Sequence, residues 1–170
     1  MNVTAKNLRR YAGTDRAGGG RQTLLEQRED ALRGGVTLVQ LREKDLPQPD
    51  FIREAAQATA LCHRYGVPLI VNDSLEVALK SGADGVHVGQ EDQPVADIRR
   101  QAGPDFLIGA TAKTLDQALA AQAAGADYLG VGACFPSPTN PHAKGTTREA
   151  PGAHVSADPL RVVALGGITP

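Results

Sequence analysis

The chain has 170 residues, with 18 Lys and Arg against 19 Asp and Glu and 41% hydrophobic residues, and we expect one soluble globular domain over residues 1–170. Near-neutral charge and 4% aromatic residues exclude the basic surface and the stacking platform of most nucleic-acid-binding proteins. No apolar run is long enough for a membrane span, and residues 1–10 resemble no secretion signal, so we expect a cytoplasmic protein with neither nucleic-acid nor membrane partners.

Strand and helix signals alternate along the chain. A weak strand signal at residues 8–14 is followed by the loop Gly18-Gly19-Gly20. Thr23 is expected to cap a helix to about Arg33, because Glu26 completes a capping box. The later elements predicted are a strand at 36–41, a helix from 51 that ends at Gly66, strands at 67–71 and within 82–88, helices at 75–80 and 95–101, a strand at 106–110, a helix at 115–124, and strands at 128–132 and 162–165.

Short connections between alternating strands and helices predict parallel β/α units with right-handed crossovers. The segments at 82–86 and 125–129 are near-copies, as expected when one unit recurs. About seven strands are one unit short of closure, so the predicted fold class is a (β/α)8 TIM barrel that is truncated after the seventh strand. A doubly wound open sheet is the alternative, but no Gly-x-Gly-x-x-Gly follows the first strand.

The apolar run at residues 36–41 ends in polar side chains. Gln40, Arg42 and Lys44 occupy alternate positions there, and the carboxyl ends of parallel strands are where such proteins bind ligands. Arg42 would form paired hydrogen bonds to phosphate oxygens and Lys44 would supply a point charge, which suits a pyrophosphate. A surface salt-bridge cluster is the alternative.

Two acidic residues follow successive strands. Asp73 and Asp92 are oxygen ligands suited to Mg²⁺ held by one or two carboxylates plus substrate phosphate oxygens. The alternative is that each caps the following helix.

His87 is expected in the sheet interior, and His63, His142 and His154 have no partner spacing. Cys62 and Cys134 likewise lack metal or disulfide spacing, so we expect reduced structural thiols. The same strand-end rim is expected to carry Asn72, Gln90, Glu91 and Thr111.

The segment from 133 to 157 is rich in Pro, Gly, Ser and Thr. Ser137 and Thr139 are expected to bind phosphate, with Lys144 and Arg148 closing over it. A disordered excursion is the alternative. Gly166-Gly167 would let a ligand phosphate approach backbone amides, and such a site occurs late in many barrels.

These motifs, in this order, resemble the thiamine-phosphate synthase family over essentially the whole chain. The matching segments lie at 14–16, 39–44, 71–73, 82–92, 125–132, 135–139 and 164–168. The resemblance implies an enzyme that joins hydroxymethylpyrimidine pyrophosphate to thiazole phosphate with Mg²⁺. Pyrophosphate departure leaves a pyrimidinylmethyl cation, so catalysis requires charge stabilisation on the leaving group.

The resemblance assigns roles by position. The pyrimidine-pyrophosphate contacts would be Gln40, Arg42, Lys44 and Asn72, and the magnesium ligands would be Asp73 and Asp92. The thiazole-phosphate side would carry Ser137, Thr139 and Gly167. Catalysis itself is expected to depend on Arg42, Lys44 and Thr111.

Four features depart from the family pattern. Asn140 replaces a usual Lys, and we hypothesise that Lys144 substitutes for it. Ser74 stands where Arg is common, and Thr111 stands where Ser is usual. The chain ends at Pro170, so we expect poor activity or none from the chain alone. It would then be either a fragment of a longer protein or a barrel completed by a partner, and homo-oligomer formation is one such case. The alternatives are a truncated, inactive phosphate-binding homologue and a thiazole tautomerase-like protein, which generally lacks the acidic motif at 90–92.

Overall fold

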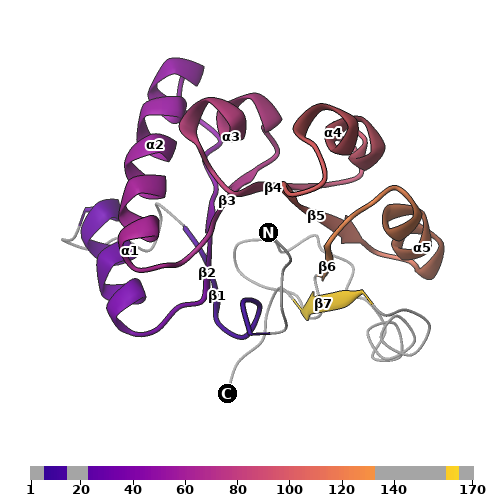
Figure 1. The fold of residues 1–170 in the computed structure, drawn as a ribbon, viewed down its shortest axis with the longest axis horizontal. Coiled ribbons are helices and arrows are strands. Elements are labelled where there is room, and N and C mark those ends of the chain that lie inside the picture. The colour runs from indigo at the N-terminus through magenta and orange to yellow at the C-terminus, as the bar shows by residue number, and fades with distance from the viewer. Residues whose placement is uncertain (1–5, 15–22, 133–159, 165–170) are drawn as a thin grey trace. The chain divides into compact units, whose positions relative to one another are not determined.

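Strands and helices alternate along the chain in the computed structural model, which describes residues 6–14, 23–132 and 160–164 (Figure 1). The strands are β1 (Tyr11–Gly13), β2 (Leu38–Leu41), β3 (Leu69–Asn72), β4 (Gly85–Val88), β5 (Leu107–Ala112), β6 (Tyr128–Val131) and β7 (Arg161–Ala164). The helices are α1 (Leu24–Arg33), α2 (Gln48–Arg64), α3 (Leu75–Ser81), α4 (Val95–Ala102) and α5 (Leu115–Ala123). The predicted order of elements in these ranges is confirmed, and their ends are shifted by short distances.

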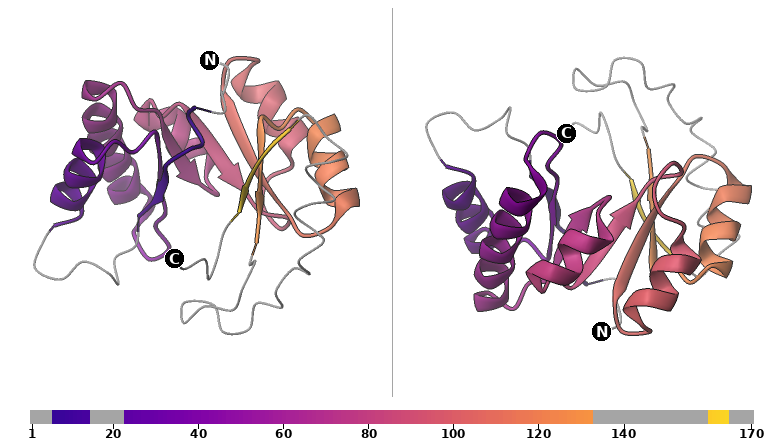
Figure 2. Two further views of the ribbon diagram at one scale, coloured as in Figure 1. Left: turned by 90° about the horizontal axis from the view of Figure 1, so that it is seen from below. Right: turned by 90° about the horizontal axis from the view of Figure 1, so that it is seen from above.

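The chain divides into two compact units. The first comprises Met1–His87 with Asp105–Leu107, and the second comprises Val88–Pro104 with Ile108–Pro170. In the first, β1 to β4 pair in sequence order and all pairs are parallel. In the second, β6 pairs in parallel with β5 and with β7, which is drawn in yellow beside it in Figure 2. The single domain over 1–170 stays a prediction.

Burial explains why these segments are strands and helices. Leu38, Leu69 and Ile70 are fully buried, as expected for parallel strands that are covered by helices. Helix α2 contacts β2 and β3, and α3 contacts β3, so both helices pack against β3. None of the helices in the described ranges combines the length and the apolar character of a membrane span.

Local signals set the ends of α1 as predicted. The Glu26 backbone N–H donates to Thr23 Oγ1 at 3.3 Å, and the Thr23 backbone N–H donates to Glu26 Oε2 at 2.8 Å. Hydrogen bonds from Thr23 to the Glu26 carboxylate lower the pKa of that group. This reciprocal arrangement is the capping box that the Thr23 and Glu26 spacing predicts.

The two near-copies at 82–86 and 125–129 form the same hydrogen-bonded junction. In the first unit, the Asp84 N–H donates to Leu69 O at 2.9 Å, and the Leu69 N–H donates to Asp84 Oδ2 at 2.8 Å. In the second unit, the Asp127 N–H donates to Ile108 O and the Ile108 N–H donates to Asp127 Oδ2, each at 2.7 Å. Each Asp therefore clamps the amino end of the strand before its own.

A cationic or titratable side chain from a helix completes each clamp. His63 Nε2 lies 2.9 Å from Asp84 Oδ2, and Arg99 Nη2 lies 2.8 Å from Asp127 Oδ2. No partner for His63 was predicted, because Asp84 is 21 residues away along the chain. The amino ends of barrel strands contribute to stability and not to catalysis, so we assign both contacts to the fold.

Cys62 is buried on α2. Burial raises the pKa of its thiol to about 11, an effect that the Asp84 carboxylate increases and Arg28 opposes. A thiol with so high a pKa is almost entirely protonated near neutral pH, which fits the structural role expected for it. Cys134 lies outside the described residues.

Gly85 on β4 is closely packed, and this gives a test of the fold. A Cβ there would lie 2.3 Å from Leu107 O and 2.8 Å from Ile70 Cδ1. We expect Gly85→Ala to lower the free energy of unfolding by about 3 kcal/mol in urea titrations, because a backbone atom must move. Gly66→Ala is the control, since a Cβ there meets no described atom within 4 Å and only its φ of +67° is strained, which costs about 1 kcal/mol. Equal losses for the two variants would contradict the packing argument.

Candidate active site

Two amide side chains meet at the carboxyl ends of neighbouring strands in the first unit. Gln40 is the third residue of β2 and Asn72 is the last residue of β3, and both are half-buried. Gln40 Nε2 donates to Asn72 Oδ1 at 3.3 Å. The structure therefore brings together two of the predicted substrate contacts, although 32 residues separate them along the chain.

Arg42 and Lys44 follow β2 and are exposed. Within the described parts of the chain, no ion pair involves either side chain. The structure thus gives no support to a surface salt-bridge cluster as the reason for these two cations. The backbone at Arg42 is held, because its N–H donates to Thr14 Oγ1 at 3.0 Å.

Asp73 stands directly after β3 in an unusual backbone conformation. Its φ is +66°, and it is the single non-glycine residue with positive φ among those described. Its N–H donates to His87 O at 2.8 Å. An L-residue in this region costs about 1 kcal/mol, and such strain is concentrated at functional sites.

Helix capping does not explain Asp73. The cap of α3 is Ser74, whose hydroxyl accepts a hydrogen bond from the Val77 N–H at 3.2 Å. The capping alternative is therefore wrong for Asp73, because Ser74 takes that structural role. His87 is buried, with 4% of its surface exposed, as expected for a histidine of the sheet interior.

Asp92 lies in the second unit, in the segment between β4 and α4. Pro94 occupies the N-cap position of α4, so the capping alternative is wrong for Asp92 as well. Asp92 Oδ2 accepts a hydrogen bond from the Gly89 N–H at 2.7 Å, which closes the turn after β4. The carboxylate also lines a cavity of about 230 Å³ within this unit.

Thr111 lies inside β5 and not beyond it, because that strand continues to Ala112. The residue is half-buried, and its carbonyl oxygen accepts a hydrogen bond from Gln90 Nε2 at 2.5 Å. This hydrogen bond attaches the segment after β4 to the carboxyl-end part of β5, in the same unit. The remaining predicted site residues lie outside the described ranges, namely Ser137, Thr139, Asn140, Lys144, Arg148 and Gly167.

The carboxylates of Asp73 and Asp92 suit Mg²⁺ better than zinc. Among the residues whose positions are described, no group of three or more His, Cys, Asp or Glu side chains could hold a metal ion. A zinc site built wholly from protein ligands is therefore not found in this part of the chain. Mg²⁺ is commonly held by one or two carboxylates plus substrate phosphate oxygens, and Asp73 and Asp92 provide oxygen of that type.

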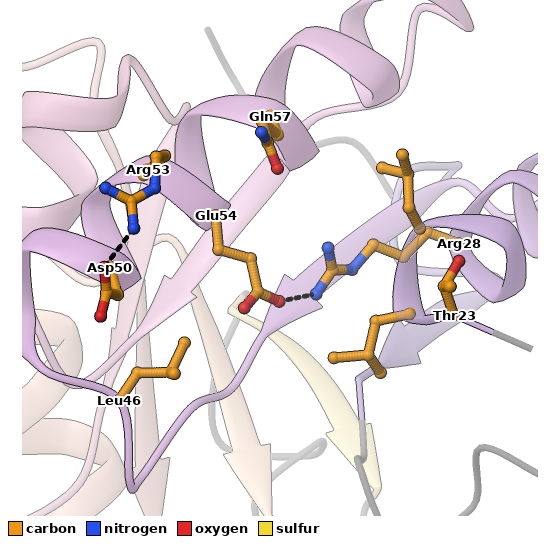
Figure 3. Close-up of a pocket in the computed structure, with 9 residues that line it drawn as sticks. Thr23, Arg28, Leu46, Asp50, Arg53, Glu54 and Gln57 are labelled. Carbon is orange, nitrogen blue, oxygen red and sulfur yellow. Dashed lines mark hydrogen bonds and ion pairs between the residues drawn. The ribbon is translucent and has the colours of Figure 1, made fainter.

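A larger cavity, of about 530 Å³, lies between α1 and α2 (Figure 3). Arg28 is bonded to Glu54 at 2.5 Å across it, and Arg53 pairs with Asp50. None of the predicted site residues lines this cavity, and its two arginines are already paired with acids in its wall. We therefore do not assign it to substrate.

Comparison with known proteins agrees with this architecture. The family model described as thiamine monophosphate synthase matches residues 11–170. The thiamine-phosphate synthase of Ruminiclostridium cellulolyticum is 44% identical over 158 residues, which cover 93% of this chain and 75% of the relative. The thiamine-phosphate synthase of Caldanaerobacter subterraneus subsp. tengcongensis is 41% identical over 158 residues, which cover 93% of this chain and 74% of the relative.

A solved structure extends the agreement to the fold. The thiamine phosphate pyrophosphorylase from Pyrococcus furiosus superimposes with a TM-score of 0.84 at 35% identity, covering 96% of this chain and 77% of that one. The similarity confirms the predicted (β/α)8 barrel class. Because the family model spans nearly all of the chain and the two relatives share more than two fifths of the aligned residues with it, the chain belongs to the thiamine monophosphate synthase family.

Proposed function

We propose that the chain is a transferase that joins hydroxymethylpyrimidine pyrophosphate to thiazole phosphate, giving thiamine phosphate and pyrophosphate. In this reaction the C–O bond to pyrophosphate breaks and its electron pair leaves with the pyrophosphate. A C–N bond forms to the thiazole nitrogen. The observation that carries the proposal is the strand-end group of the first unit, where Gln40, Asn72 and the strained Asp73 lie together in a chain of this family.

The proposed residue roles follow from charge and hydrogen-bonding capacity. Arg42 and Lys44 stabilise the negative charge that develops on the departing pyrophosphate, with Arg42 binding two oxygens at once. The Gln40–Asn72 hydrogen bond uses the Asn72 oxygen and leaves its NH₂ group as a donor toward the pyrimidine. The reaction needs no paired acid and base, because charge stabilisation and alignment of the two substrates suffice.

Asp73 and Asp92 are the proposed ligands of Mg²⁺, together with pyrophosphate oxygens. The ion, when bound, supplies positive charge to the leaving group. The Thr111 hydroxyl is proposed to contact substrate. Ser137, Thr139 and Gly167 are proposed to bind the thiazole phosphate, with Lys144 taking the place of the cation lost at Asn140.

Two alternatives predict different outcomes when both substrates are present. A thiazole tautomerase-like protein would isomerise its thiazole substrate and leave the pyrimidine unused, and an inactive homologue would bind phosphate only. The matched relatives carry synthase names, and nothing favours either alternative. A cytoplasmic location and homo-oligomer formation stay predictions from the sequence.

The direct test is to incubate the purified chain with both substrates, with Mg²⁺ or with EDTA. We expect thiamine phosphate and pyrophosphate in equal amounts, at a rate about 100-fold higher with Mg²⁺, because the ion offsets several kcal/mol of developing charge. Chromatography and a pyrophosphate assay provide the measurements, and reactions lacking either substrate are the controls. An isomerised thiazole without pyrimidine consumption would support the tautomerase. Phosphate binding without any product would support the inactive homologue.

A further inference from the structure

Thr14 holds the end of β2 by two hydrogen bonds on either side of Leu41. Its backbone N–H donates to Gln40 O at 3.0 Å. Its hydroxyl oxygen accepts a hydrogen bond from the Arg42 N–H, also at 3.0 Å. Thr14 directly follows β1, which pairs in parallel with β2, so the two contacts continue that pairing beyond the last residue of β1.

The Thr14 hydroxyl accepts the hydrogen bond that a backbone carbonyl would accept inside a sheet. Strand β1 ends at Gly13 and β2 ends at Leu41, so Arg42 is the first residue past the paired segment. The side chain of Thr14 satisfies the Arg42 N–H at that point. Without the hydroxyl, the backbone of Arg42 would lose its link to the neighbouring strand.

We propose that Thr14 is a positioning residue that aims Arg42 at the pyrophosphate of the substrate, an inference that rests on the proposed function. The Arg42 side chain is exposed and forms no ion pair in the described ranges, so the point from which it reaches substrate is set by its backbone, which Thr14 holds. A small displacement of the Arg42 guanidinium would be costly in catalysis, because a charge held in the wrong place is no longer aligned with the reacting bond. Thr14 touches no reacting atom in this scheme and acts only through Arg42.

The test compares Thr14→Val, which removes the hydroxyl, with Thr14→Ser, which keeps it. For Thr14→Val we expect KM for hydroxymethylpyrimidine pyrophosphate, and Kd for inorganic pyrophosphate with Mg²⁺, to rise about 10-fold. KM for thiazole phosphate should not change. Thr14→Ser should restore both values to within about twofold of the unsubstituted chain.

Thr37→Val is the matched control, because Thr37 makes similar contacts at the other end of β2. Its hydroxyl accepts a hydrogen bond from the Arg10 N–H at 3.0 Å and donates to Asn7 O at 2.9 Å. This variant should lower the urea midpoint and leave KM and Kd unchanged. All variants are assayed well below their unfolding midpoints.

The outcomes separate this inference from the proposed function. Weaker pyrophosphate binding in Thr14→Val, with Ser rescue, would support positioning even if no thiamine phosphate is made. An unchanged KM and Kd in Thr14→Val, failure of Thr14→Ser to rescue, or an equal effect of Thr37→Val would each overturn it. If the unsubstituted chain does not bind pyrophosphate, both the inference and the proposed function are wrong.

Discussion

Asp73→Asn is expected to slow thiamine phosphate formation about 100-fold, equivalent to about 3 kcal/mol of transition-state stabilisation. The substitution keeps the shape of the side chain and its tolerance of positive φ, and it removes the charge that is proposed to bind Mg²⁺. The free energy of unfolding should change by less than about 0.5 kcal/mol, since Ser74 and not Asp73 caps α3. Initial rates over a range of Mg²⁺ concentrations, together with urea titration, measure both effects.

Asp73→Gly separates function from strain at the same position. Glycine adopts a φ of +66° without steric cost, so this variant should be as inactive as Asp73→Asn but more stable by about 0.5 kcal/mol. Asp30→Asn is the control, because Asp30 is an exposed acid on α1 and is not one of the proposed magnesium ligands. Full activity in Asp73→Asn at limiting Mg²⁺ would rule out the ligand role.

Glu54→Gln is expected to lower the free energy of unfolding by about 3 kcal/mol or more. Glu54 is bonded to Arg28 at 2.5 Å, and the Arg28 side chain is only 4% exposed. Arg28 Nε is already buried and has no hydrogen-bond partner among the described residues. Removing the carboxylate would leave a permanent charge in a site that water barely reaches, which is more costly than losing the pair altogether.

The double variant Arg28→Met with Glu54→Leu tests this reasoning. Because it removes both charges and retains apolar volume, we expect its free energy of unfolding to lie within about 1 kcal/mol of the unsubstituted chain. Lys80→Gln is the exposed counterpart, since Lys80 and Glu76 form a pair at 2.7 Å with both side chains more than half exposed. It should cost less than about 0.5 kcal/mol. Should the double variant be as unstable as Glu54→Gln, the loss would arise from packing and not from the unpaired charge.

The elements of the fold could be predicted because their signals are local in the sequence. The Thr23 and Glu26 spacing identified the start of α1, and the repeated Gly-Ala-Asp segment identified two helix-to-strand junctions. The carboxyl-end position of Gln40 and Asn72 followed from the period of the strands. In each case the relevant residues are neighbours or belong to one repeating unit.

The contacts that the sequence did not predict join residues that are far apart in the chain. Thr14 and Arg42 are 28 positions apart, and Arg28 and Glu54 are 26 apart. No periodic pattern pairs such side chains, since their meeting depends on how helices and strands pack. Asp73 presents a different difficulty, because Asp and Ser are both good caps and stand side by side, and only the backbone distinguishes them.

The Asp84 and Asp127 clamps separate the alignment of a strand, which is set at its amino end, from the choice of side chains at its carboxyl end. A slip of one residue in β3 or β5 would break both hydrogen bonds of its clamp and turn the apolar side chains to the wrong face. The position of each strand is thus fixed at its amino end, away from Asp73 and Thr111. Side chains at the carboxyl ends can therefore be changed without loss of the alignment of the strands that carry them.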